Sequence, residues 1–196
     1  MATMYSLFFG VLFLAVLFLG GIGNSAIERE VAEDQPRSMA MGARPGQADR
    51  TENFRENIVN IAVQEIGIGE ATGNNDGKRV EEYLAYTGLG KGYAWCAAFV
   101  SWCYGQAGLP VPRNAWSPAL FPMARRYKKE QVEEDAVRPA DLFAIYNHRL
   151  RRIDHVGIVR KIERNWILTV EGNVADRVVS KRRAVSAIYA FSNWLD

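Results

Sequence analysis

Cysteine and histidine are scarce in this sequence of 196 residues, which contains two of each. A zinc site is not expected, because neither a CxxC pair nor an HxxxH pair occurs. A strong excess of one charge is also missing, since the formal net charge is +2. Proteins that bind nucleic acid usually carry a strongly basic face. We therefore expect no metal, no cofactor and no nucleic-acid partner.

The two cysteines, Cys96 and Cys103, lie in one segment whose apolar residues have helical spacing. At a rise of ~1.5 Å per residue their Cα atoms would be about 10.5 Å apart, beyond the roughly 7 Å limit for a disulfide. Cys103, in the middle of the apolar face, is expected to be a small buried hydrophobe. Cys96 opens the helix, where free N–H groups and the helix dipole lower the pKa of a thiol. Cys96 is therefore the candidate nucleophile.

The N-terminal part of the chain is predicted to be a targeting segment and a linker. An unbroken apolar run covers residues 7–23 and is followed by small residues and charges. Residues 1–26 are either a cleaved secretory signal or a retained membrane anchor, and both predict export to the periplasm, the cell envelope or the medium. Residues 27–50 are polar without apolar periodicity, which predicts a flexible linker. Residues 51–196 have the usual size of one domain.

Helices come first in this domain and strands follow. Apolar spacings of three and four predict helices over 51–66, 78–86 and 96–107, and a shorter element over 117–127 that Pro122 limits. β-branched and aromatic runs predict strands over 141–146, 155–162, 166–171, 177–181 and 187–191. Short connections favour antiparallel pairing. The predicted fold class is α+β, with N-terminal helices packed on a C-terminal antiparallel sheet or small barrel.

The loop over residues 67–77 is rich in glycine, asparagine and aspartate and invites comparison with a calcium-binding loop. Aligning Gly77 with the sixth position of such a loop places Thr72 at the first and Tyr83 at the twelfth, so the two most important ligand positions are wrong. A plain turn, with Asp76 as the N-cap of the next helix, is the expected structure.

A thiolate enzyme needs a proton shuttle, and the candidates are His148 and His155. His148 lies in a basic loop, where a solvated side chain is expected. His155 opens a strand of a sheet that can face the Cys96 helix, and from the residues alone it is either a general base or a structural histidine. Glu171 and Asn173 lie two apart in the next strand and would project from one face, so either could accept the His155 ring N–H.

Three motifs carry a family resemblance: Trp95-Cys96-Ala97-Ala98-Phe99, His155-Val156-Gly157 and Glu171-Gly172-Asn173. In this order they resemble the CHAP (cysteine, histidine-dependent amidohydrolase/peptidase) domains of bacterial and phage peptidoglycan hydrolases. The resemblance covers roughly residues 54–194 and implies a papain-like fold.

The resemblance also implies hydrolysis of an amide bond in peptidoglycan. It assigns Cys96 as nucleophile, His155 as base, Glu171 as the residue that orients the histidine, and Asn173 as an accompanying polar residue. Ala140 stands where relatives usually have glycine before an aspartate, which is a departure at a turn.

The expected function is a peptidoglycan hydrolase, either an N-acetylmuramoyl-L-alanine amidase or a stem-peptide endopeptidase. Tyr93, Trp95 and Trp116 could wall a groove for a peptide or sugar chain, although isolated aromatics are more often core residues. The alternatives are a catalytically silent envelope-binding protein and a transglutaminase-like acyl transferase. The expected partners are peptidoglycan and, through the N-terminal segment, a membrane, and we expect a monomer.

Overall fold

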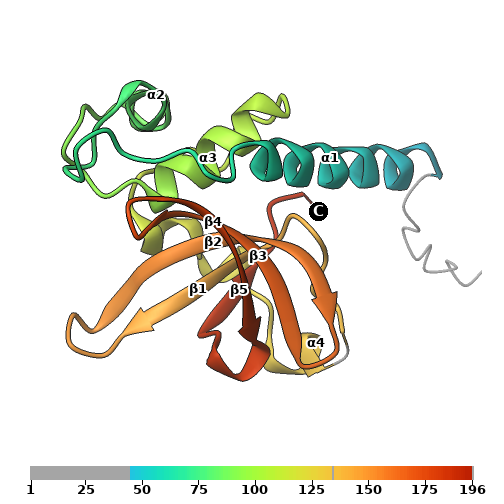
Figure 1. Cartoon of the computed structure of the whole chain (residues 1–196). Helices are drawn as coiled ribbons and strands as arrows, with labels where there is room; N and C mark the ends of the chain where they lie inside the picture. Colours follow the sequence, from blue (N-terminus) through green and yellow to red (C-terminus); the bar gives the residue numbers. More distant parts are fainter. Residues whose placement is uncertain (1–44, 134, 196) are drawn as a thin grey trace, which may run out of the picture. The chain divides into compact units, whose positions relative to one another are not determined.

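The computed structural model of the protein describes residues 45–133 and 135–195 (Figure 1). The predicted signal or anchor over residues 1–26 and most of the predicted linker lie outside the described residues. Within the described residues 45–133 and 135–195, no helix is both long enough and hydrophobic enough to cross a bilayer.

Three helices form the first half of the domain: α1 (Pro45–Gln64), α2 (Lys78–Tyr86) and α3 (Cys96–Gln106). The predicted spans of α2 and α3 are confirmed. α1 begins upstream of residue 51, so residues 45–50, which the sequence assigned to the linker, are helical. These positions could not be recognised from apolar spacing, because residues 47–50 are exposed and contribute nothing to the core.

The cap of α2 differs from the prediction. Gly77 occupies the N-cap position without a side-chain hydrogen bond. The Asp76 carboxylate instead accepts the Thr72 N–H at 2.9 Å and the Thr72 hydroxyl at 2.7 Å. Asp76 therefore closes its own loop instead of capping the helix.

Short helical turns connect α3 to the sheet. They are the 3-10 turns η1 (Ser117–Leu120) and η2 (Met123–Arg125), followed by α4 (Lys129–Glu133). Pro122 separates η1 from η2, as expected of a proline that cannot continue a helix. The single helical element predicted over 117–127 is thus two separate turns.

A five-stranded antiparallel sheet forms the second half. Its strands are β1 (Leu142–Asn147), β2 (Arg152–Glu163), β3 (Trp166–Val174), β4 (Arg177–Ala184) and β5 (Ala190–Ser192), with the 3-10 turn η3 (Val185–Ala187) before β5. The strand order is β4-β3-β2-β1-β5. Figure 1 shows α1, α2 and α3 on one side of this sheet. The predicted α+β architecture is confirmed, and of the two predicted forms, an antiparallel sheet or a small barrel, the structure has the sheet.

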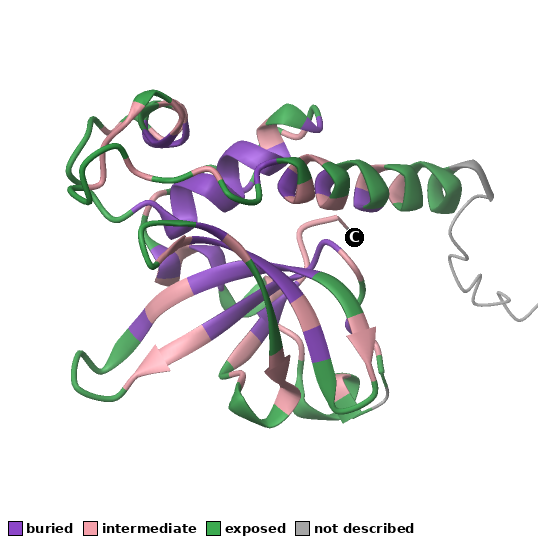
Figure 2. Cartoon of the chain, in the orientation of Figure 1, coloured by how far each residue is buried: buried purple, intermediate pink, exposed green. Residues whose placement is uncertain are grey.

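Helix α3 is the centre of the core. Nine consecutive residues, Cys96–Tyr104, are buried, and Figure 2 shows buried colour along this helix and the middle of the strands below it. α3 packs against α1 and α2 as well as against β2 and β3. A helix covered on all sides is apolar on all sides, which is why this segment contains no charged residue.

Gly172 lets β3 approach α3 closely. A Cβ atom at this position would lie 2.8 Å from the Phe99 Cβ and 2.8 Å from the Trp95 ring. Both neighbours are fully buried, so they cannot move aside without disturbing the core. The contact explains why a glycine stands directly after Glu171.

We therefore expect Gly172→Ala to lower the free energy of unfolding by about 1–3 kcal/mol through overpacking. Gly90→Ala is the matched control, because no heavy atom lies within 4 Å of the Cβ it would add. Denaturant unfolding of both proteins checks the prediction. Equal midpoints for the two variants would show that the interface can widen freely.

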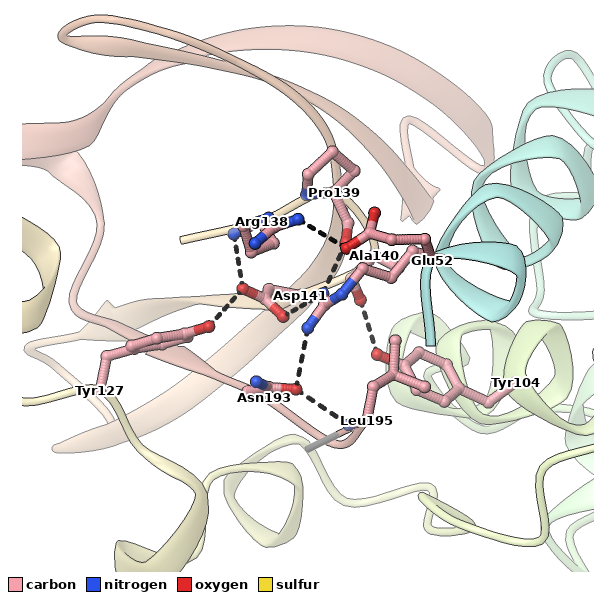
Figure 3. Close-up of polar contacts among 10 residues, drawn as sticks. Glu52, Tyr104, Tyr127, Arg138, Pro139, Ala140, Asp141, Asn193 and Leu195 are labelled. Carbon is pink, nitrogen blue, oxygen red and sulfur yellow. Dashed lines mark hydrogen bonds and ion pairs between the residues drawn. The ribbon is translucent and has the colours of Figure 1, made fainter. Parts of the chain in front are cut away.

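A buried polar cluster anchors α1 to the start of β1. Asp141 is fully buried and accepts a hydrogen bond from Arg55 of α1 at 2.9 Å. Its second oxygen accepts the Tyr127 hydroxyl and the Arg138 N–H, both at 2.7 Å (Figure 3). Burial raises the pKa of Asp141, while Arg55 and the other donors oppose the rise. The cluster fixes the helix against the sheet.

Ala140 completes this corner. Its φ is +69°, in the left-handed region that favours glycine, which accounts for the glycine expected there by resemblance. Figure 3 shows Tyr104 reaching Ala140, whose carbonyl accepts the Tyr104 hydroxyl at 2.6 Å. The Ala140 N–H donates to the carbonyl of Val159 on β2 at 2.8 Å. The turn therefore keeps its geometry in spite of the side chain.

Candidate active site

Cys96 is the first residue of α3 and is 5% exposed. A cysteine in the first turn of a helix lies beside N–H groups that have no partner within the helix. The Cys96 Sγ also lies 3.4 Å from the Ser117 hydroxyl and 4.0 Å from the backbone oxygen of Asp154. The thiol is thus held between the helix start, η1 and β2.

His155 of β2 lies between the thiol and a carboxylate. Its Nε2 is 2.8 Å from the Oε2 of Glu171, and its interaction with Cys96 accounts in part for the raised pKa of the ring. Gly157, two residues after His155 on β2, leaves room for the Glu171 side chain. A Cβ atom at Gly157 would lie 2.9 Å from the Glu171 Cγ. The structure therefore brings Cys96, His155 and Glu171 together in one chain of contacts.

Glu171 of β3 is fully buried and has four donors. Its Oε1 accepts the Thr169 hydroxyl at 2.6 Å and the Arg183 Nε at 2.7 Å. Its Oε2 accepts the Arg183 Nη2 at 2.6 Å and lies against His155. Every lone pair that the carboxylate directs into the protein is thereby used.

The pKa values of the three groups are shifted together. Burial opposes ionisation of Cys96, but hydrogen bonds and charge from His155 lower its pKa below that of a free thiol. Burial likewise opposes the charged form of His155, yet the contacts with Cys96 and Glu171 raise its pKa to about 9. Burial disfavours ionised Glu171, but Arg183, His155 and Thr169 bring its pKa to about 2. The site favours a thiolate–imidazolium pair beside an ionised carboxylate.

Asn173 is not on the same face as Glu171, contrary to the expectation. The register of β3 against β4 shifts between Glu171 and Val174, and Asn173 has a φ of +58°. At this irregularity the Asn173 amide donates to the Asn75 side chain at 3.2 Å. Glu171 contacts the His155 ring, and the catalytic parts assigned to Glu171 and Asn173 stay predictions.

The three aromatic candidates have different surroundings. Trp95 is fully buried, stacks on Tyr83 and donates its indole N–H to Glu70 at 2.8 Å, so its assignment to a substrate groove was wrong. Tyr93 and Trp116 are 58% and 57% exposed. Both line a groove of about 470 Å³ together with neighbouring residues such as Leu89.

Two residues of the site were missed in the sequence. Ser117 carries no motif, and its place beside Cys96 depends on the path of the chain after α3. Arg183 belongs to the basic cluster over residues 181–183, whose composition indicates a solvated surface. Unlike its neighbours Lys181 and Arg182, it is only partly exposed, because its guanidinium binds Glu171. Alternation along β4 separates Arg183 from Arg182 but not from Lys181, which lies two residues away on the same face of the strand, so no sequence pattern identifies Arg183.

The loop over residues 67–77 shows side-chain and backbone hydrogen bonds where a calcium site was considered. In the part of the chain that the structure describes, no group of three or more histidine, cysteine, aspartate or glutamate side chains could hold a metal ion.

Comparison with known proteins bears on the family. The model of the CHAP domain matches residues 88–173, which confirms the resemblance seen in the motifs. A solved structure of an NlpC/P60 family protein from Bacillus cereus ATCC 10987 is similar with 13% identity and a TM-score of 0.46, over 72% of this chain. The alignment covers 40% of the length of that structure. The comparison with curated proteins finds no match.

Proposed function

For a chain whose residues 88–173 match the CHAP domain, a family of peptidoglycan hydrolases, we propose that Cys96 is the nucleophile of a cysteine amidohydrolase that acts on the bacterial cell wall. The observation that carries the proposal is the contact of His155 with both Cys96 and Glu171. A structural histidine needs one satisfied hydrogen bond, whereas this one joins a buried thiol to a buried carboxylate. That arrangement has the nucleophile, base and orienting residue of a cysteine hydrolase.

The mechanism follows from these contacts. The Cys96 thiolate attacks an amide carbonyl, and the N–H groups at the start of α3 hold the oxyanion of the tetrahedral intermediate. His155, protonated in the resting pair, gives its proton to the leaving amine. Water activated by the same histidine then hydrolyses the thioester. Glu171 keeps the ring in place through both steps.

The groove lined by Tyr93 and Trp116 is the proposed binding site for the wall polymer. Tyr93 lies three residues before Cys96, and Trp116 directly precedes Ser117, which contacts the thiol. Exposed aromatic rings suit the apolar faces of sugars and peptides.

Peptidoglycan lies outside the cytoplasmic membrane, so export is part of the proposal. The apolar run over residues 7–23 is the feature that supports it, as a cleaved signal or as an anchor. The bond cut is either the amide between sugar and stem peptide or a bond within the stem.

Digestion of purified peptidoglycan by the full chain, followed by mass analysis, tests activity and bond choice together. We expect soluble fragments with one new free amine and one new carboxyl per cleavage. Intact stem peptides separated from glycan indicate an amidase, and shortened stems indicate an endopeptidase. New cross-linked amides would indicate an acyl transferase, and an unchanged polymer that retains the protein would indicate a silent binding protein. Either of the last two results would contradict the proposal.

A further inference from the structure

The buried carboxylate that orients His155 depends on a cation from the edge strand of the sheet. Glu171 is fully buried, whereas Arg183 of β4 is 23% exposed at its side chain. Burying an ionised carboxylate without a partner is strongly unfavourable. Arg183 therefore supplies the charge that allows Glu171 to stay ionised inside the protein.

The geometry of this pair is specific. The Arg183 Nε and Nη2 bind the two different oxygens of Glu171 at 2.7 and 2.6 Å. The pair is a bidentate fork, which a lysine ammonium cannot reproduce. The fork fixes the plane of the carboxylate, and this plane sets where Oε2 meets the His155 Nε2.

Four charged groups from four elements meet here: Cys96 of α3, His155 of β2, Glu171 of β3 and Arg183 of β4. Ser117 of η1 and Thr169 of β3 add neutral hydroxyl donors, and Arg183 also lies over the Phe143 ring of β1. Two of the charged groups are anions when the site is active, and two are cations. The two negative and two positive charges cancel only while Arg183 is present.

We propose that Arg183 is a positioning residue that sets the pH range over which the Cys96 thiolate and the His155 imidazolium coexist. The proposal rests on the proposed function for its meaning in hydrolysis, while its test follows the thiol itself. Removing a cation makes both anions harder to form and the imidazolium easier to keep. Thiolate formation and loss of the histidine proton should therefore both move to higher pH.

The alkylation rate of Cys96 by iodoacetamide, measured from about pH 4 to about pH 10 on the full chain, reports the thiolate without any wall substrate. Mass spectrometry of the modified peptide separates Cys96 from Cys103, which is fully buried. The acid limb of the profile is the range in which the alkylation rate rises with pH as the thiolate forms. We expect Arg183→Gln to shift this limb upward by about one pH unit, which is a tenfold loss of rate at a given pH on the limb. Arg183→Lys, which keeps the charge without the fork, should shift it by about half as much.

Arg182→Gln is the matched control. Arg182 is adjacent in sequence but exposed, with its guanidinium 4.2 Å from the centre of the Trp166 ring and its Nε 3.5 Å from Glu163. The alkylation profile of Arg182→Gln should follow that of the protein without substitutions. The proposal is wrong if the alkylation profile of Arg183→Gln matches that of the protein without substitutions, or if it is shifted no more than the profile of Arg182→Gln.

Should Arg183→Gln not fold, the Arg183→Lys profile decides, and an unshifted profile in that folded variant also overturns the proposal. A shifted alkylation profile together with an unchanged wall polymer would uphold the role of Arg183 while refuting the proposed function. The two conclusions can thus fail separately.

Discussion

Cys96→Ala should release no fragments from purified peptidoglycan, with kcat/KM lowered by about 10⁴-fold or more. The reason is that the thiolate forms the covalent bond of the proposed mechanism. The Ser117 hydroxyl lies 3.4 Å from the sulfur and takes no part in the proposed mechanism. Fragment release measured over time at saturating and at low substrate checks the prediction.

Cys103→Ala is the control for this experiment, because the same chemical change is made one heptad later in the same helix. Cys103 is fully buried, and burial raises the pKa of its thiol well above the usual value. The Cys103→Ala variant should therefore lose about 1 kcal/mol of its free energy of unfolding without losing activity. Parental activity in Cys96→Ala would end the cysteine mechanism and favour a silent binding protein or contamination by another hydrolase.

His155→Ala should lower kcat/KM by about 10³-fold or more, since both proton transfers of the proposed mechanism use this ring. It should also slow alkylation of Cys96 near neutral pH, because the thiolate loses the neighbour that lowers its pKa. The second measurement separates a lost partner from general unfolding. Circular dichroism of the variant establishes that the fold is kept.

The pH dependence of the unmodified protein follows from the same residue. With a pKa of about 9, His155 keeps its proton below that pH and can donate it to a leaving amine. Activity should therefore decline as the pH rises through about 9, and the decline should be absent from the residual activity of His155→Ala.

His148→Ala is the control for His155→Ala. His148 is exposed at the turn after β1, where its ring meets only the edge of Tyr146 among the described aromatic side chains. Its removal should change kcat/KM by less than about twofold. A large loss in His148→Ala, or none in His155→Ala, would exchange the roles assigned to the two histidines.

The places of Cys96 and His155 in the fold were predictable because each rests on a local feature. Cys96 stands at a helix start that glycines and apolar spacing define, and His155 lies in a strand that apolar and β-branched residues mark, although β2 begins at Arg152 and not at His155 as predicted. From the residues alone Glu171 was one of two candidates, because strand alternation placed Asn173 on the same face, and the family resemblance selected Glu171 as the orienting residue. The irregularity of β3 at that point decides between them, and nothing in a single sequence indicates where register shifts.

Partners that depend on tertiary packing were not predictable. The basic cluster 181–183 has the composition of a solvated surface, and only the edge position of β4 beside Glu171 distinguishes its last member. Trp95 illustrates the opposite error, since an aromatic residue next to the nucleophile was expected near substrate. The neighbouring Tyr83 and Glu70 take up its ring and its N–H, which its sequence position does not indicate.

The anchoring of α1 has a practical consequence for fragment design. Residues 88–173 are the part recognisable as a CHAP domain, but Arg55 lies before this stretch and Arg183 lies after it. A protein trimmed to the recognisable part would leave two buried carboxylates, Asp141 and Glu171, without their guanidinium partners. Breaking a buried pair in this way typically costs about 3–5 kcal/mol, a large share of the stability of a small domain. The boundaries of a stable fragment are therefore set by these two arginines, and they lie well outside the boundaries of the family signature.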